Sequence, residues 1–369
     1  MTIYIVSFII TILLTYVIQK SKSKSIIKMV CIFLVIFIPS FVGGMRDFTI
    51  GTDVLIYGKD FFEQAVNCSS FMHYQNIVQT DMGYAMLNFI VSRFTDNVNI
   101  FFLVSQLIIN GLMFATIYNN RKKVPMWFSM LIYLTVYYCR TYNYMRQSFA
   151  LAIILYSTKY IEKNDLKKYI IGILAAELFH PTAIFAISLY FLKYIANRKN
   201  RIIYEGMVLL IVVGISLNIS NVLKILYQIG IVPERYYAYT YRFVNSTGGY
   251  SVIDVIYRMI WIIIYEIFGK KMRKEDSINN CYGMCLWLDL IFFFCRTKLV
   301  YADRISLYFG YTTILFIPKM IEEISNIRKG NSNIVYLISC VIFVIYWYMK
   351  FIVYGSSEVY PYTSTILGI

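Results

Sequence analysis

The sequence predicts an all-α integral membrane protein, a polytopic bundle of about ten to twelve transmembrane helices. Of its 369 residues, 59% are hydrophobic and only 15% are charged, whereas soluble domains carry about 25% charged residues. Apolar runs close to the roughly 20 residues that cross a bilayer recur along the whole chain. We therefore expect one polytopic membrane domain over residues 1–369, with no separate soluble domain.

The net charge of +15 does not indicate a nucleic-acid-binding protein. The Lys and Arg residues fall in short clusters between apolar runs, which is the pattern of membrane topology signals. The expected partner is the lipid bilayer, with no nucleic acid. Most of the seven Cys lie inside apolar runs, so the sequence predicts no disulfide framework.

Ten apolar runs bounded by charged residues are expected to form single transmembrane helices. The first run lacks a basic leader and a cleavage site of small residues, so we expect it to be retained as a span. The ten runs are 3–18, 26–43, 98–118, 125–139, 147–161, 202–219, 252–268, 279–295, 305–318 and 333–350.

The run from 169 to 195 is expected to form a hairpin of two short helices, broken at His180 and Pro181. At 27 residues it is long for one span and short for two. Its basic flanks, 162–168 and 196–201, face the same side only if the chain turns back within the run. A single crossing would place one basic flank outside and would invert every later loop.

The distribution of cations predicts which side each loop faces. Loops assigned to the cytoplasm hold 20 Lys or Arg and the opposite loops hold 11, in line with the positive-inside rule. Both termini then lie outside the cytoplasm. Residues 44–97 are predicted to form an outer loop with amphipathic helices, and residues 220–251 a second outer loop. The cytoplasmic loops are 19–28, 119–123, 162–168, 196–201, 269–276 and 319–331, and the other outer loops are 140–146 and 296–304.

Arginine dominates the cations of the outer loops. Eight of those 11 cations are Arg, against five of the 20 inner ones. Lys would orient the loops equally well, whereas Arg offers a rigid fork that binds phosphate oxygens bidentately. The excess of Arg therefore predicts a phosphate or diphosphate site on the outer face. Alternatively, each Arg is an interfacial anchor or the partner of a nearby acid in an ion pair. The eight are Arg46, Arg93, Arg140, Arg146, Arg235, Arg242, Arg296 and Arg304.

Short spans predict a cavity that opens outward. The runs 125–139 and 147–161 have about 15 residues each, or about 22 Å of helix, against a hydrocarbon core of about 30 Å. The segment Arg140–Gln147 between them should therefore lie below the outer membrane surface, and His180 deeper still. Because polar groups at such depth require a cavity or burial in protein, we expect Arg140, Arg146 and His180 in the cavity walls.

Six short motifs follow one another along the chain. The first is GGMRDFTIGTD (43–53), which is followed by Tyr57. The others are DMGYAMLN (81–88), YCRTYNYMRQSFA (138–150), AELFHPTA (176–183), YADRISLYF (301–309) and VYPY (359–362). Their order and spacing resemble those of the EpsG family of Wzy-like polysaccharide polymerases, over essentially the whole chain.

The resemblance implies a GT-C-like glycosyltransferase in the bacterial plasma (inner) membrane. Such enzymes join oligosaccharide repeat units carried on polyprenyl diphosphate, such as undecaprenyl diphosphate, on the outer leaflet. Their products are exopolysaccharide, capsule or O-antigen, and a chain-length regulator protein is a further partner that the resemblance suggests. The alternatives are a flippase or exporter of lipid-linked saccharide and an O-antigen ligase-type glycosyltransferase.

The chemistry of glycosyl transfer from a diphosphate needs cations at the leaving group and a base at the attacking hydroxyl. No cofactor is expected. We also expect no metal, because the outer acids are separated from one another and Asp47 and Asp303 adjoin Arg. The candidates are Asp53, Asp81 and His180 for catalysis; Arg46, Arg140, Arg146, Arg296 and Arg304 for the diphosphate; and Asn143, Gln147, Tyr57 and Tyr84 for sugar binding or support.

Several of these residues have structural alternatives. Asp53 is equally well placed to cap the helix expected after it, and Asp81 to position Tyr84. His180 before Pro181 is the candidate cap of its hairpin. Two further acids are expected in ion pairs: Asp47 with Arg46, and Asp254 with Arg258 at i,i+4 within a span.

Overall fold

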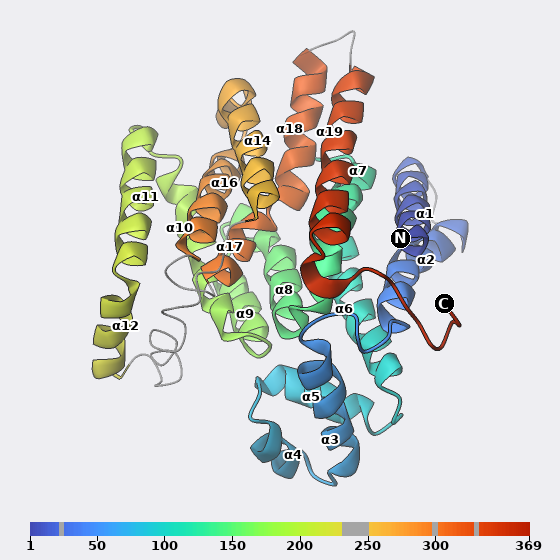
Figure 1. Cartoon of the computed structure of the whole chain (residues 1–369). Coiled ribbons are helices and arrows are strands. Elements are labelled where there is room, and N and C mark those ends of the chain that lie inside the picture. The colour runs from blue at the N-terminus through green and yellow to red at the C-terminus, as the bar shows by residue number, and fades with distance from the viewer. Residues whose placement is uncertain (22–25, 231–250, 297–301, 328–331) are drawn as a thin grey trace. The chain divides into compact units, whose positions relative to one another are not determined.

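The computed structural model describes residues 1–369 except 22–25, 231–250, 297–301 and 328–331. The described part of the chain is helical and contains no strand (Figure 1), which confirms the predicted all-α fold. It divides into two compact units: 1–184 with 314–369, and 185–313. Most of the predicted loop 220–251, with Arg235 and Arg242, falls outside the described residues.

Five helices are long and apolar enough to cross a membrane, among the residues that the structure describes. They are α1 (Thr2–Lys20), α2 (Ile26–Gly44), α6 (Val98–Asn119), α16 (Ser277–Cys295) and the stretch Ser332–Val353, which begins with α19 (Ser332–Trp347). Shorter helices lie at most of the other predicted runs. The protein is therefore a multi-pass helical membrane protein.

The first unit also contains helices that are interrupted in the middle. Helix α7 (Met126–Ile132) continues as a π-helix and then as a 3-10 helix to Tyr142, before α8 (Met145–Glu162) begins. Helix α9 (Leu166–Glu177) ends just before His180, and a 3-10 helix (Pro181–Ala186) leads to α10 (Ile187–Ile195) of the second unit. The predicted break at His180 and Pro181 is thus confirmed.

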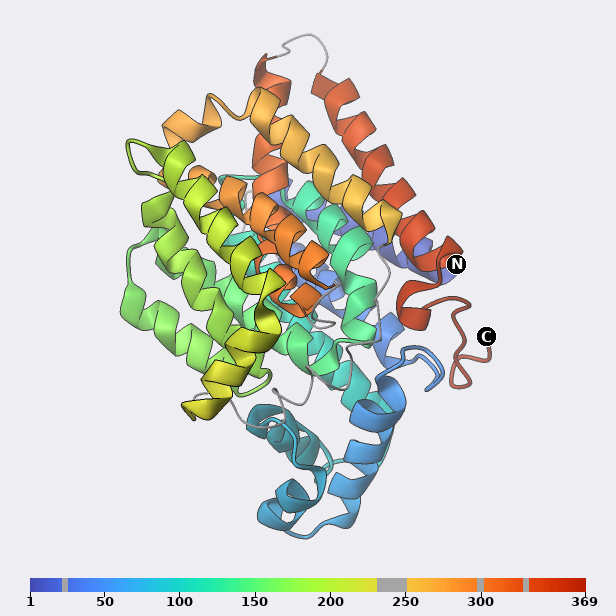
Figure 2. The same ribbon diagram turned by 60° about the vertical axis from the view of Figure 1, so that its left-hand side comes forward.

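Residues 44–97 form a layer of short helices within the first unit. A π-helix (Val54–Asp60) leads to α3 (Phe61–Asn67), which is followed by α4 (Phe71–Val78) and α5 (Met82–Val91). Helices α3, α4 and α5 lie together in both Figure 1 and Figure 2. Ala65, Cys68, Tyr74 and Ala85 form their small buried core.

The second unit contains α11 (Arg201–Leu217), α12 (Ile219–Gln228), α14 (Val252–Phe268), α15 (Met272–Glu275) and α17 (Ala302–Gly310), besides α10 and α16. Arg258 on α14 binds both carboxylate oxygens of Asp289 on α16, at 2.9 and 3.1 Å. The predicted ion pair with Asp254 is also present, at 3.8 Å. Two carboxylates therefore compensate one buried guanidinium.

The predicted run 305–318 does not form one uninterrupted helix. Helix α17 ends at Gly310, and α18 (Thr313–Ile327) begins after a turn at Tyr311 and Thr312. The hydroxyls of Thr312 and Thr313 donate to the carbonyls of Phe309 and Gly310 at 2.6 Å. Such local side-chain bonds compete with the helical pattern, and hydropathy does not detect them.

Candidate functional site

Three motifs that are distant in sequence meet around Arg146 in the first unit. Arg146 lies in the first turn of α8, and its Nη1 is 2.7 Å from Oδ2 of Asp81 and 3.3 Å from Oγ1 of Thr80. The guanidinium carbon lies 4.2 Å from the ring centroid of Tyr57. Nε and Nη2 of Arg146 have no hydrogen-bond partner among the described residues. One edge of this stacked guanidinium thus bears donors that the described residues do not use.

Tyr84 and Tyr57 brace this arrangement. The hydroxyl of Tyr84 donates to the backbone carbonyl of Tyr57 at 2.5 Å, and the Tyr84 side chain is buried. Tyr84 is therefore a supporting residue in this structure. Asp81 precedes α5 but makes no capping hydrogen bond with its side chain; its carboxylate pairs with Arg146 instead.

Asn143 fixes the turn that precedes Asp53. Its Oδ1 accepts the backbone N–H of Thr52 at 2.6 Å. The adjacent Gly51 has a φ of +107°, and a Cβ there would come within 2.9 Å of the same oxygen. Only glycine fits both conditions. Asp53 stands at the N-terminus of the π-helix without a capping hydrogen bond from its side chain, so the capping alternative is wrong.

The fourth motif is joined to the second by backbone. The N–H of Gly83 donates to the carbonyl of Leu178 at 2.7 Å, and a Cβ on Gly83 would come within 2.9 Å of that oxygen. His180, two residues later, is buried, and its Nδ1 lies 2.7 Å from Oγ1 of Thr182. This local contact is compatible with either role considered for His180.

Arg46 does not have the position expected of a diphosphate ligand. Its side chain is only 1% exposed, and the guanidinium carbon lies 4.3 Å from the ring centroid of Phe102 and 4.4 Å from that of Tyr142. It also donates to the carbonyls of Gly43 and Ile50. Arg46 therefore joins the first motif to α6 and to the third motif, and protein atoms occupy its guanidinium.

The predicted ion pair between Arg46 and Asp47 is also wrong. Oδ1 of Asp47 accepts the backbone N–H of Thr365 at 2.8 Å, and the Thr365 hydroxyl as well. Partial burial raises the pKa of Asp47, but these hydrogen bonds outweigh it and leave the pKa below its ordinary value. Asp47 thus holds the C-terminal segment.

The C-terminal segment around the last motif packs against the first motif and the residue before it. The hydroxyl of Tyr362 donates to the carbonyl of Val42 at 2.9 Å, and that of Tyr4 donates to the carbonyl of Val359 at 3.1 Å. The N–H of Asp47 donates to the carbonyl of Thr363 at 3.1 Å. The C-terminal segment therefore supports the loop 43–53, which precedes Tyr57.

Arg140 and Gln147 lie in the third motif beside Arg146. Arg140 donates from Nε to the carbonyl of Val136 at 3.1 Å and from Nη2 to the hydroxyl of Tyr346 at 2.7 Å. Gln147 is buried, which suits a supporting role. Arg140 is thus held by protein groups, whereas Arg146 keeps two donors that no residue in the described part of the chain occupies.

The remaining predicted arginines belong to the second unit. Nη1 of Arg296 lies 3.5 Å from Oδ2 of Asp303, and Arg304 lies on α17. The five predicted diphosphate ligands are thus divided between the two units, with Arg46, Arg140 and Arg146 in the first.

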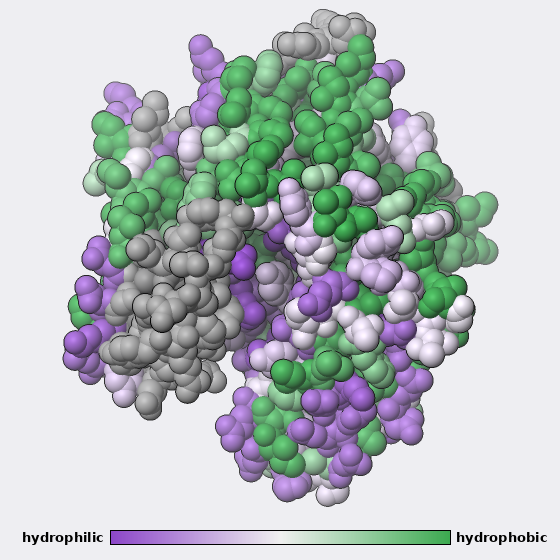
Figure 3. All heavy atoms as spheres, viewed as in Figure 1, coloured by the Kyte–Doolittle hydropathy of each residue, from purple (hydrophilic) through white to green (hydrophobic). Residues whose placement is uncertain are grey.

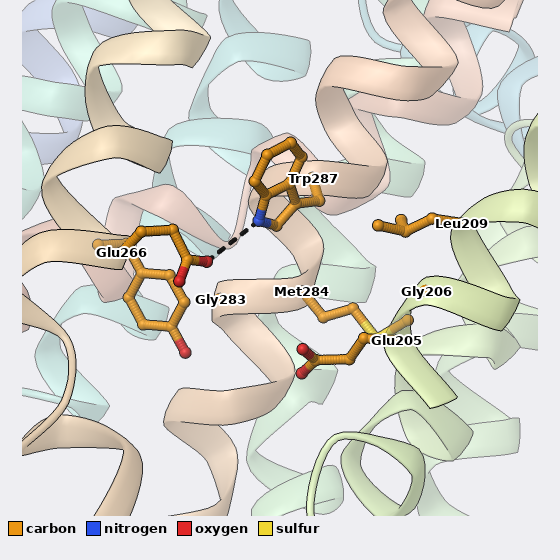
Figure 4. A pocket seen from close by; sticks show the side chains of 8 residues that line it. Glu205, Gly206, Leu209, Glu266, Gly283, Met284 and Trp287 are labelled. Carbon is orange, nitrogen blue, oxygen red and sulfur yellow. Dashed lines mark hydrogen bonds between the residues drawn. The ribbon is translucent and has the colours of Figure 1, made fainter. Parts of the chain in front are cut away.

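The second unit has a cavity of about 200 Å³, lined by α11, α14 and α16. Figure 4 shows the Trp287 indole pointing to the Glu266 carboxylate, with Nε1 to Oε1 at 3.2 Å. The other oxygen of Glu266 is 3.3 Å from Nη1 of Arg273. None of the predicted site residues lines this cavity, so we place the candidate site at Arg146.

The described residues contain no cluster of three or more His, Cys, Asp or Glu side chains arranged to hold a metal ion. The cluster around Arg146 instead joins a guanidinium with unused donors, a carboxylate and an aromatic ring. Such a set binds an anion and can exchange a proton.

Comparison with known proteins identifies the family. No curated protein and no solved structure is significantly similar to the chain. The family model described as the EpsG family matches residues 29–364, which include all six motifs. The chain therefore belongs to the EpsG family, a family of Wzy-like polysaccharide polymerases.

Proposed function

We propose that the protein polymerises polyprenyl-diphosphate-linked oligosaccharide repeat units at the outer side of the bacterial plasma membrane. The reaction is an inverting glycosyl transfer of the GT-C class, without a metal. The observation that carries this proposal is Arg146, which stacks on Tyr57 and keeps Nε and Nη2 unused beside the Asp81 carboxylate. A chain-length regulator is a further proposed partner.

The geometry supports a role for Arg146 at the leaving group. Its two unused nitrogens form a fork that matches two oxygens of a diphosphate. Negative charge grows on the diphosphate as the bond to the anomeric carbon breaks, and a fixed guanidinium stabilises that charge. Because Asp81 and Thr80 hold only Nη1, the other two nitrogens remain available to a substrate.

Asp81 is the base that this geometry favours. The acceptor hydroxyl oxygen bonds to the anomeric carbon, polyprenyl diphosphate leaves, and the hydroxyl proton passes to a carboxylate. A diphosphate on Nε and Nη2 shares the positive charge of Arg146 with Asp81, which weakens the ion pair and makes the carboxylate a better proton acceptor. Asp53 and His180 are the alternative bases.

The decisive test is incubation of the purified protein with polyprenyl-diphosphate-linked repeat unit. A ladder of products is expected, because each product is again a donor. A single transferred chain would instead indicate ligase chemistry. Unchanged substrate would overturn the proposal and leave the transport alternative.

We predict that residues 44–97 face away from the cytoplasm. In a Cys-less version, Asn76→Cys on α4 should react with a membrane-impermeant thiol reagent in intact cells, and Lys122→Cys should not. Lysed cells provide the control, because both positions should then react. Labelling at Lys122→Cys in intact cells would contradict the predicted topology and would place Arg146 on the cytoplasmic side, where the proposed reaction does not occur.

We predict that activity survives EDTA. Asp81 is already paired with the guanidinium of Arg146. That guanidinium repels a metal cation and competes with it for the carboxylate. Arg146 therefore neutralises the charge of the diphosphate, which is the role of Mg²⁺ in other transferases. The rate of ladder formation should stay within about twofold of the untreated rate. Loss of activity that Mg²⁺ or Mn²⁺ restores would contradict the prediction.

A further inference from the structure

Helix α5 has one buried face and one exposed face, and the exposed face is apolar. Tyr84, Ala85 and Asn88 are buried, whereas Met82, Met86 and Ile90 are 49%, 53% and 46% exposed. These three follow one another at intervals of four residues and so share a side of the helix, over about 12 Å. No charged residue occurs in α5.

The orientation of α5 is fixed by close contacts at its first turn. Gly83 binds the carbonyl of Leu178 and leaves no space for a Cβ. The ring of Tyr84 packs edge-to-face on Phe101 and Phe149, with centroids 5.9 and 6.3 Å apart. The exposed face therefore cannot turn inward without breaking these contacts.

The exposed apolar surface continues onto the end of α9. Leu178, which contacts Gly83, is half exposed, and so is Leu174 one turn earlier. We call Leu174, Leu178, Met82, Met86 and Ile90 the apolar track. Figure 3 shows hydrophobic side chains among hydrophilic ones over the part formed by α3, α4 and α5. In a membrane protein such a surface is covered either by bilayer lipid or by the apolar part of a ligand.

The track begins next to the anion-binding residues. Met82 directly follows Asp81, whose carboxylate lies 2.7 Å from Arg146. A ligand whose negatively charged head binds Arg146 therefore has an apolar surface within reach of the group attached to that head. A polyprenyl diphosphate has this construction: the hydrocarbon chain is bonded directly to the diphosphate.

We propose that the apolar track binds the polyprenyl chain of the lipid-linked substrate while Arg146 holds its diphosphate. This inference rests on the proposed function, which supplies the substrate class. Bulk bilayer lipid is the competing occupant. It would cover the exposed Met72 and Ile77 of α4 in the same way.

The test compares two carriers that share a diphosphate and differ in chain length. Binding of undecaprenyl diphosphate and of geranyl diphosphate is measured on the purified full chain in one detergent. The track variant is Met86→Gln with Ile90→Gln. The matched control is Met72→Gln with Ile77→Gln, because the two isoleucines are 46% and 48% exposed and the residue types are the same.

The native chain is expected to bind the long carrier more tightly than the short one. The track variant should weaken the long carrier about tenfold and affect the short carrier much less, because only the long chain can cover both Met86 and Ile90. The control variant should bind both carriers as the native chain does. Arg146→Lys should weaken both carriers alike.

Two results would overturn the track. The first is a track variant that still prefers the long carrier as strongly as the native chain does. The second is a control variant that loses as much affinity for the long carrier as the track variant, which would mean that bulk lipid covers all of these helices. In either case the dependence on Arg146 would leave the proposed function standing. If the native chain binds neither carrier, the proposed substrate class is wrong, and so is the role of the track.

Discussion

Arg146→Lys is expected to lower kcat/KM for polymerisation about a hundredfold or more, in a protein that still folds. An ammonium group retains the charge but loses the planar fork, so Nε and Nη2 no longer meet two diphosphate oxygens together. It also loses the stacking of the guanidinium on Tyr57. The rate is measured from ladder formation at varied donor concentration, and folding from the elution profile and helix content in detergent.

Arg121→Lys is the matched control for this variant. The Arg121 guanidinium carbon also lies 4.2 Å from a ring centroid, that of Tyr118, and it donates to a backbone carbonyl. It lies in the predicted cytoplasmic loop 119–123, away from the motifs, so its replacement should change kcat/KM less than about twofold. Equal losses in both variants would mean that stacked arginines stabilise the fold and that Arg146 has no special role.

The helices were predictable because hydropathy and charge act over many residues at once. Runs such as 98–118 and 252–268 coincide with α6 and α14 to within a residue or two. The break at Pro181 was predictable because proline lacks an N–H for the helical pattern. The break at Thr312 was not, because it depends on hydroxyl bonds to Phe309 and Gly310.

The site was predictable as a set of residue types but not as a set of contacts. The excess of arginine in the predicted outer loops indicated an anion. It did not distinguish Arg146, which has unused donors among the described residues, from Arg46, which lies between two aromatic rings. That difference depends on Phe102 and Tyr142, which come from separate helices. Asp289 was missed for the same reason, since it lies 31 positions from Arg258.

The C-terminal segment was recognisable in the sequence only as a motif of unknown purpose. Its contacts with Val42 and Asp47 join residues more than 300 positions apart. No periodicity or spacing rule reaches across such a separation. The signal that the sequence did contain was the tyrosine pair in VYPY, because a tyrosine carries both a large apolar ring and a hydrogen-bonding hydroxyl.

Asp81→Asn is expected to separate binding from turnover. The asparagine side chain has nearly the same shape but no charge, so the substitution removes a negative charge that partly neutralises Arg146 and repels a bound diphosphate. The affinity for polyprenyl diphosphate should therefore rise severalfold, while kcat falls about a hundredfold to ten-thousandfold because no carboxylate accepts the hydroxyl proton. Binding is measured with geranyl diphosphate, and kcat from ladder formation at saturating donor.

Asp53→Asn is the comparison that identifies the base. If Asp81 is the base, Asp53→Asn should leave the diphosphate affinity unchanged and lower kcat much less than Asp81→Asn does. Weaker diphosphate binding in Asp81→Asn would contradict the prediction, because it would show that the carboxylate serves to orient Arg146. A loss of kcat in Asp53→Asn alone would transfer the role of base to Asp53, which follows the turn that Asn143 fixes through Thr52. If Asp81 is the base, removing its charge from the ion pair with Arg146 raises the diphosphate affinity and lowers kcat. If the ion pair were merely structural, the same substitution would lower both.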